Sequence, residues 1–408
     1  MTLIKPFRAL RPAPGRAAEI LAPPYDVLSS AEARELAKGK PWSFLHVSKA
    51  EIDLDPTTDP YDRAVYAKAA ENLRRMITAG VLKRDDRPYY YVYRLTWQGR
   101  VETGLAAIAS LAAYAENRIR RHEYTTLAKE DDRVCQIEAV NAQTGPVMIA
   151  YPTAPEIDAV LARAAAGNPA VDVSTAGVRH QLWVIDDDAT IAALTRAVDA
   201  LPALYIADGH HRSAAAERVA QARGENGRGY FLAVLFPQHE MTILDYNRVL
   251  RDLNGHSADE LLAEIRRRCA VEASDKPVRP AQAREFGMVL AGRWYRLTLP
   301  AERVGARGQS DDPVARLPVT LLARNIIQPI FGITDPRTDK RIDFVGGGRG
   351  LGELERLVAS GRMAAAFALY PTQMRDLMAV ADAGAVMPPK STWFEPKLAD
   401  GMVSHVLD

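Results

Sequence analysis

Cysteine is scarce in this chain, which has only Cys135 and Cys269 among its 408 residues. The two cysteines lie far apart and neither belongs to a CxxC pair, so a disulfide framework and a cysteine-rich metal site are excluded. Few cysteines are typical of proteins that work in a reducing compartment. We therefore expect a cytoplasmic protein.

The chain also lacks a long apolar run and an excess of one charge. No stretch approaches the roughly 20 apolar residues that span a bilayer, and Lys5 and Arg8 interrupt the N-terminal stretch where a signal peptide needs continuous apolar residues. The 52 Lys and Arg balance 51 Asp and Glu, which gives a net charge of +1. Such a balance creates no global field toward nucleic acid or an anionic membrane. Neither is an expected partner.

Several catalytic motifs are absent. The sequence contains no HExxH and no GxSxG, and a zinc hydrolase is not expected. A glycine-rich stretch at 344–350 precedes a helical pattern at Glu353–Ala359. It matches neither GxGxxG in a βαβ unit nor the GxxxxGK[ST] of a P-loop, so we interpret it as a mobile surface loop.

The composition is that of an ordinary globular protein, with 48% hydrophobic and 25% charged residues. An amphipathic helix is predicted at 59–79, and strand-like runs then alternate with helical patterns over 89–236, beginning with a hairpin around 98–100. Further along, Ser257 and Glu260 form a capping box that predicts a new helix. These patterns predict an α+β fold with mixed sheets and helices.

The most unusual segment is a predicted strand that passes directly into a predicted helix. The turn between them consists of five polar or flexible residues, Asp208, Gly209, His210, His211 and Arg212. Glycine allows a sharp turn, the free N–H groups of a helix start attract anions, and the histidines and the arginine add donors. The turn therefore predicts a phosphate site in which Asp208 holds a divalent metal or positions a hydroxyl. The alternative is that Asp208 caps the helix and the histidines are structural.

A second charged cluster covers residues 118–133. Glu123, beside His122, could act as general base on a substrate hydroxyl, while Lys129 and Arg133 could clamp phosphate oxygens. The alternative is a solvated helix start whose ion pairs contribute little.

Near the C-terminus, residues 390–397 contain lysine, serine and threonine, which could bind phosphate or cover a sheet edge. Lys397 is the candidate phosphate ligand from this stretch.

Five motifs together resemble the bacterial domain-of-unknown-function 1015 (DUF1015) family. They are spread along nearly the whole chain: Ala22-Pro23-Pro24-Tyr25-Asp26, Arg121-His122-Glu123-Tyr124-Thr125, Lys129-Glu130-Asp131-Asp132-Arg133, Ala207-Asp208-Gly209-His210-His211-Arg212 and Lys390-Ser391-Thr392-Trp393-Phe394-Glu395-Pro396-Lys397.

The Asp-Gly-His-His-Arg turn is also similar to the signature of free serine kinases of the ParB/sulfiredoxin-like superfamily, in which the turn binds phosphate and an acidic residue deprotonates serine. The resemblance implies a ParB/serine-kinase-like N-terminal region, 1–253, and a smaller α/β C-terminal region, 254–408, that completes the cleft. It assigns phosphate binding to the turn and to Lys129, Arg133 and Lys397. It assigns catalysis to Glu123 as base with Asp208 and His211.

The leading hypothesis is a phosphotransferase that moves a phosphoryl group from pyrophosphate, with Mg²⁺, onto free L-serine or a similar small hydroxy acid. A strand-end carboxylate, a helix N-terminus and several cationic side chains suffice to hold pyrophosphate with Mg²⁺, and such a donor needs no adenine pocket. One alternative is a non-catalytic ParB-like module that binds a nucleotide or nucleic acid, and another is a phosphoserine phosphatase. The sequence leaves open the donor, which could be a nucleotide, the acceptor and the oligomeric state.

Overall fold

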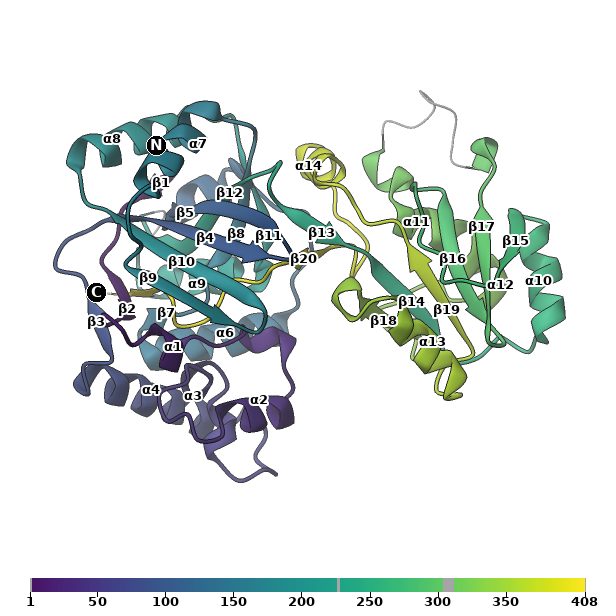
Figure 1. Cartoon of the computed structure of the whole chain (residues 1–408), viewed down its shortest axis with the longest axis horizontal. Helices are drawn as coiled ribbons and strands as arrows, with labels where there is room; N and C mark the ends of the chain where they lie inside the picture. The colour runs from purple at the N-terminus through teal and green to yellow at the C-terminus, as the bar shows by residue number, and fades with distance from the viewer. Residues whose placement is uncertain (1, 226–227, 304–311, 408) are drawn as a thin grey trace. The chain divides into compact units, whose positions relative to one another are not determined.

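The computed structural model describes residues 2–225, 228–303 and 312–407, which form two compact units (Figure 1). Unit 1 comprises Met1–Met241 and Pro396–Asp408, and unit 2 comprises Thr242–Glu395. The chain thus passes into unit 2 at residue 242, rather than at the expected 254, and its last residues return to unit 1. The return depends on backbone pairing of a short terminal strand, which leaves no periodic signal in the sequence.

Unit 1 is built on a nine-stranded mixed sheet with the strand order β6-β11-β8-β12-β5-β4-β10-β9, with β1 added beside β5. The pairs β11–β6 and β12–β8 are parallel and the other pairs are antiparallel. The predicted α+β fold with mixed sheets is confirmed. The strands are β1 (Ile4–Lys5), β4 (Tyr90–Trp97), β5 (Arg100–Ser110), β6 (Ile119–Arg120), β8 (Val147–Tyr151), β9 (Val171–Thr175), β10 (Val178–Ile185), β11 (Leu204–Asp208) and β12 (Tyr230–Pro237).

The predicted hairpin is present as β4 and β5, joined through Gln98 and Gly99, which both have positive φ (48° and 76°). Two consecutive left-handed residues give the tight turn whose twist matches paired strands. The helices of unit 1 are α1 (Ala17–Ile20), α2 (Ser30–Ala37), α3 (Leu45–Ser48), α4 (Arg63–Thr78), α5 (Leu111–Ala115), α6 (Leu127–Val140), α7 (Pro155–Ala164), α8 (Asp188–Asp199) and α9 (His210–Ala222).

Helices bury their apolar stripes on this sheet and on one another. Ile157 of α7 and Leu194 of α8 join the main apolar core of the strands, while Ile137 of α6 meets Ala215 and Val219 of α9. The predicted amphipathic helix is α4, which begins at Arg63 because the Asp62 side chain accepts a hydrogen bond from the backbone N–H of Ala64.

A second, four-stranded sheet of unit 1 brings distant segments together in the order β3-β2-β21-β7. The C-terminal strand pairs with β2 on one side and β7 on the other. This pairing carries the residues that precede it, including Lys397 and Asp400, into unit 1. The strands are β2 (Ala9–Pro12), β3 (Leu82–Arg84), β7 (Ala142–Gln143) and β21 (Ser404–Val406).

Unit 2 contains a six-stranded antiparallel sheet, in the order β15-β17-β16-β19-β14-β18, and a two-stranded ribbon, β13–β20. Its strands are β13 (Thr242–Leu244), β14 (Tyr246–Leu250), β15 (Ala270–Ser274), β16 (Glu285–Leu290), β17 (Arg293–Thr298), β18 (Ile342–Gly346), β19 (Ala365–Leu369) and β20 (Trp393–Glu395). Its helices are α10 (Ala258–Arg266), α11 (Pro318–Leu322), α12 (Gln328–Phe331), α13 (Leu351–Ala359) and α14 (Met374–Asp382). The predicted capping box of Ser257 and Glu260 is confirmed at the start of α10.

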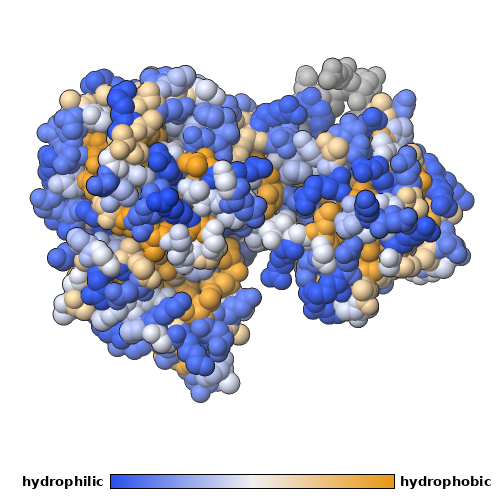
Figure 2. Space-filling view, in the orientation of Figure 1, coloured by the Kyte–Doolittle hydropathy of each residue, from blue (hydrophilic) through white to orange (hydrophobic). Residues whose placement is uncertain are grey.

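The surface shown in Figure 2 is mostly hydrophilic, with hydrophobic residues gathered in smaller patches. Within the described ranges, none of the helices combines the length and the apolar character that a membrane crossing requires.

Candidate functional site

The site is organised by the junction between β11 and α9. The strand residues Leu204–Ala207 are buried and apolar, and the strand ends at Asp208. Gly209 follows with a φ of 99°, and a Cβ on it would lie 3.0 Å from Nε of Arg212. Only glycine accepts this conformation without strain. The strand-turn-helix predicted from the sequence is present. Gly209, not Asp208, is the N-cap of α9, so the helix-cap alternative does not explain the aspartate.

Asp208 is held between two cationic side chains. One of its oxygens lies 2.7 Å from Nη2 of Arg212, and the other lies 3.7 Å from Nζ of Lys397. Burial acts to raise the pKa of Asp208, but the charges of Lys397 and Arg212 outweigh it and hold that pKa well below its ordinary value. The carboxylate is therefore ionised, and its role in the described contacts is to anchor two cations.

Arg212 is fixed by three backbone and side-chain groups. Besides Asp208, it donates through Nη1 to the carbonyl of Pro146, and its Nη2 lies 3.9 Å from Asp26. Burial opposes its charge, but Asp208 and Asp26 raise its pKa above the ordinary value. Arg212 is thus a permanent and immobile positive charge below the turn.

Arg133 supplies a second fixed cation from α6. Its guanidinium carbon lies 3.8 Å from the ring centroid of Tyr25, and its Nη2 lies 2.7 Å from Asp132. Burial raises the pKa of Tyr25 to about 12, so the phenol stays neutral. Nε of Arg133 also donates to Asp132 at 2.9 Å, so the aromatic ring and this carboxylate together hold the guanidinium in place.

Two adjoining hollows meet at these cations. The smaller, about 460 Å³ with its mouth, is lined by residues that include Arg133, Arg212 and Asp400. The larger, about 940 Å³ with its mouth, is lined by Lys129, Arg133 and His211 among others. Both share four lining residues, Tyr25, Ser48, Arg133 and Gln136. The structure thus brings together the predicted Lys129, Arg133 and His211, which come from two different helices.

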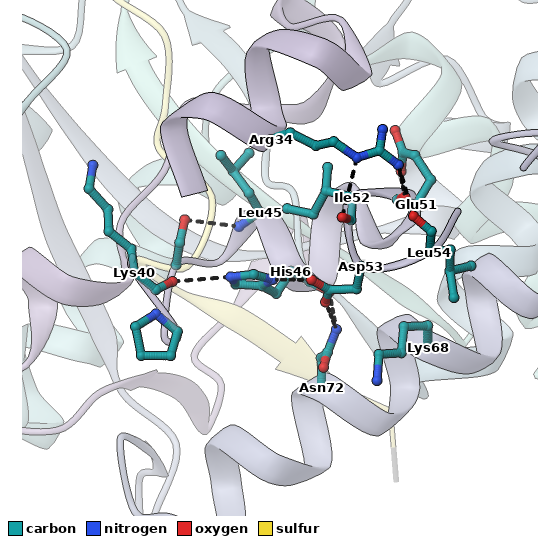
Figure 3. Close-up of polar contacts among 12 residues, drawn as sticks. Arg34, Lys40, Leu45, His46, Glu51, Ile52, Asp53, Leu54, Lys68 and Asn72 are labelled. Carbon is teal, nitrogen blue, oxygen red and sulfur yellow. Dashed lines mark hydrogen bonds and ion pairs between the residues drawn. The ribbon is translucent and has the colours of Figure 1, made fainter. Parts of the chain in front are cut away.

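The segment of α3 and the 3-10 turn Ala50–Asp53, which lines part of the larger hollow, is held by the polar contacts shown in Figure 3. Nδ1 of His46 lies 2.8 Å from Asp53, and Asn72 of α4 donates to the same carboxylate at 2.7 Å. Arg34 of α2 donates to the backbone carbonyl of Glu51 at 2.7 Å. Such bonds hold the intervening segment, which contributes Ser48, Lys49 and Glu51 to the hollow.

Glu123 lies beside the first turn of α9. Its Oε2 is 3.7 Å from Nδ1 of His210, and its side chain is 43% exposed. The backbone N–H of His122 points to Nε2 of His210 at 3.5 Å, while the backbone N–H of Thr126 donates to Nε2 of His211 at 3.2 Å. The structure therefore joins the two clusters predicted from the sequence. Glu123 is not among the residues that line either hollow.

Both buried histidines at this junction are neutral. Burial lowers the pKa of His122 to about 4 and holds the pKa of His210 well below its ordinary value. The two rings meet edge to face, with centroids 4.4 Å apart. A neutral His210 whose Nε2 faces an N–H group carries its proton on Nδ1, toward Glu123. His210 is thereby suited to orient that carboxylate.

Metal binding was expected at Asp208, but the contacts of this residue do not fit a magnesium ion, because two cationic side chains already face its oxygens. Ligand atoms of His122, Glu123 and His210 lie within 4.8 Å of one another. Two imidazoles with one carboxylate suit a transition metal rather than Mg²⁺, which prefers oxygen ligands.

Sequence reasoning missed Asp400 as a site residue. This buried aspartate accepts a hydrogen bond from the backbone N–H of Tyr25 at 3.2 Å and lines the smaller hollow. Burial raises the pKa of Asp400 to about 7, against the opposing charge of Arg212. The sequence motif around Tyr25 identified the segment that contacts Asp400. No motif or periodic pattern near Asp400 identified the aspartate itself.

The fold and the site define an α+β protein that gathers fixed cations around a strand-to-helix turn. The chain belongs to the family described as Protein of unknown function (DUF1015), whose profile matches residues 4–320. The family predicted from the five motifs is thus confirmed. None of the curated proteins matches the chain significantly.

Several solved structures are distantly similar. A conserved hypothetical protein from Pyrococcus furiosus is 12% identical, with a TM-score of 0.35, over 70% of this chain and 91% of its own. A free serine kinase in complex with AMP is 11% identical, with a TM-score of 0.34, over 70% and 89%. SbnI with C-terminal truncation, from Staphylococcus aureus, is 11% identical, with a TM-score of 0.36, over 73% and 86%.

Proposed function

We propose that unit 1 is a phosphotransferase that moves a phosphoryl group onto the hydroxyl of a small hydroxy acid such as free L-serine. The observation that carries the proposal is the set of cations at the end of β11. Arg212 and Lys397 both contact Asp208, and Arg133 lines both hollows. Phosphoryl transfer needs little more from a protein than fixed positive charge and a positioned nucleophile.

The donor is proposed to be pyrophosphate, with a nucleotide as the alternative. Arg133 and Arg212 both line the smaller hollow and place two positive charges beside it. Lys129, which is exposed and makes no ion pair with a described residue, faces the larger hollow with His211. These cations neutralise charge that develops on the transferred group and on the leaving phosphate.

The acceptor is proposed to be an amino acid because the larger hollow carries both signs of charge. Lys49, Lys129 and Arg133 line it together with the carboxylates of Asp26, Glu51 and Asp132. A zwitterion needs partners of both signs within a few ångströms of each other. A purely cationic hollow would instead favour a second anion.

In the proposed reaction Glu123 accepts the proton of the substrate hydroxyl. The hydroxyl oxygen of the substrate forms a bond to the phosphorus as the bond between the phosphorus and the leaving phosphate breaks. His210, whose Nδ1 lies 3.7 Å from Oε2 of Glu123, is proposed to position this carboxylate when the substrate binds. With pyrophosphate and serine the products are phosphoserine and inorganic phosphate. Magnesium belongs to the proposal as a counter-ion that the donor carries on its phosphates, because Asp208 is occupied by Arg212 and Lys397.

The test is phosphorus NMR of the full chain with Mg²⁺ and L-serine, with pyrophosphate in one sample and ATP or ADP in others. We expect a phosphoserine resonance with pyrophosphate. Glu123→Gln should slow its appearance by about a hundredfold or more, the usual effect of losing a general base. Lys129→Ala should slow it about tenfold or more because a phosphate contact is lost, whereas Lys38→Ala, an exposed lysine outside the hollows, should not.

The same experiment separates the alternatives. Release of inorganic phosphate from added phosphoserine, without transfer from any donor, would replace the proposal with a phosphatase. No reaction in any sample would leave a binding module and refute the proposed activity.

A further inference from the structure

We propose that unit 2 contains a second anion site, built on the glycine-rich stretch, which binds the oligophosphate chain of pyrophosphate or of a nucleoside di- or triphosphate. A hollow of about 1230 Å³ with its mouth lies in this unit. Its wall includes four arginines, Arg251, Arg349, Arg356 and Arg362. The inference is independent of the proposed function, since all of its residues lie in unit 2.

The glycine-rich stretch is ordered structure, not the loop expected from the sequence. Strand β18 ends at Gly346, one 3-10 turn covers Gly347–Arg349, and α13 begins at Leu351. A Cβ on Gly346 would lie 2.6 Å from the ring of Trp393, and a Cβ on Gly347 would lie 2.6 Å from Oδ1 of Asp245. These glycines therefore permit a close approach of the backbone to its neighbours. The stretch places Arg349 directly before the free N–H groups of α13.

The charges around the hollow leave two arginines in surplus. Nε of Arg356 is 2.7 Å from Glu353, and Arg251 is 3.7 Å from Asp343. Within the described ranges, the side chains of Arg349 and Arg362 make no hydrogen bond and no ion pair within 4 Å, although both interact electrostatically with Glu353. Guanidinium groups that line a common hollow without a carboxylate in direct contact, beside the positive end of a nine-residue helix, favour a ligand with two or more phosphate groups.

The surroundings of these arginines favour a discrete ligand over a nucleic-acid strand. Asp343 and Glu353 lie among them in the same wall, and they interrupt any continuous basic strip. The whole chain carries a net charge of only +1, so it has no overall positive potential that would attract a long polyanion. Phe344 and Trp393 line the same hollow and offer aromatic surface to a base or a ribose.

The test is isothermal titration of the full chain with pyrophosphate, ADP, ATP and, as a compound with one phosphate, AMP. We expect binding of the oligophosphates that weakens at least tenfold in an R349A/R362A double variant. A matched control is Arg324→Ala, because Arg324 is an exposed arginine of unit 2 outside the hollow. AMP should bind more weakly than ADP, and a preference for ADP over pyrophosphate would show that the aromatic wall takes part.

Binding in unit 1 is separated by a second variant, Lys129→Ala with His211→Ala, which alters the larger hollow there and leaves unit 2 intact. Loss of the same binding event in this variant, with no effect of R349A/R362A, would overturn the inference. Absence of binding by any oligophosphate would overturn it too. Because the readout is binding to unit 2, failure of phosphoryl transfer in unit 1 does not affect the result.

Discussion

Asp400 should make the stability of the protein depend on pH in a direction opposite to most aspartates. Its folded pKa is about 7, against an ordinary value of 3.8, because burial outweighs the attraction of Arg212 and Arg133. Between about pH 4 and pH 7, Asp400 is therefore protonated in the folded state and ionised in the unfolded state. Below the unfolded pKa of Asp400, the free energy of unfolding carries no penalty from this residue. As the pH rises through the folded pKa, the free energy of unfolding falls.

The magnitude follows from the difference between the two pKa values. A tenfold change in proton affinity is worth about 1.4 kcal/mol, so ionised Asp400 costs about 4 kcal/mol above pH 7. Asp400→Asn removes this cost and keeps an oxygen that can accept from the backbone N–H of Tyr25. The variant should be more stable than the parent at pH 8 by up to about 4 kcal/mol, with the difference shrinking toward zero near pH 4.

Urea unfolding of both proteins at pH 4.5, 6 and 8, followed by circular dichroism and tryptophan fluorescence, measures this difference. Asp186→Asn, an exposed aspartate of the same unit, is the control and should show no such trend. A variant that is equally stable at all three pH values, or less stable than the parent at pH 8, would refute the reasoning. In that case Arg212 and Arg133, rather than burial, would govern the carboxylate.

Three further changes have defined outcomes. Gly209→Ala should lower stability by about 1–3 kcal/mol and reduce activity, because φ is 99° and the new Cβ meets Arg212; an unchanged melting temperature would contradict this. Arg133→Lys should raise KM for the donor about tenfold with a smaller effect on kcat, since lysine cannot keep the contacts of the guanidinium with both Tyr25 and Asp132; an unaltered KM in steady-state kinetics would contradict this. Ser257→Ala should cost about 1 kcal/mol through the lost cap of α10 and leave phosphoryl transfer unchanged, as paired unfolding and activity assays can establish.

Local patterns in the sequence were sufficient for the elements that local chemistry determines. The hairpin at Gln98 and Gly99 and the capping box at Ser257 both follow from residues within a few positions of each other. The turn after Asp208 is of the same kind, because its glycine, histidines and arginine are consecutive. Features of this kind can be predicted from a few consecutive residues.

Other features could not be predicted because they depend on pairing between distant segments. The backbone N–H groups of Ala22 and Asp400 donate to each other's carbonyls at 3.2 and 2.9 Å. This bridge places Asp400 beside Tyr25, and no periodicity near either residue indicates it. The contact of Lys397 with Asp208 depends on the same return of the chain. The sequence identified Lys397 by chemistry but could not identify its partner.

The return of the chain to unit 1 makes unit 2 an insertion whose two ends are neighbours. Thr242 and Glu395 are paired residues of the β13–β20 ribbon. A short linker from Met241 to Pro396 should therefore excise unit 2 and leave the remaining segments of unit 1 in one polypeptide. A chain that simply stops after Glu395 would do the reverse, because it would remove a central strand of the four-stranded sheet together with Lys397 and Asp400. In this architecture the inserted unit lies in the middle of the chain, and the residues from Pro396 onward complete unit 1.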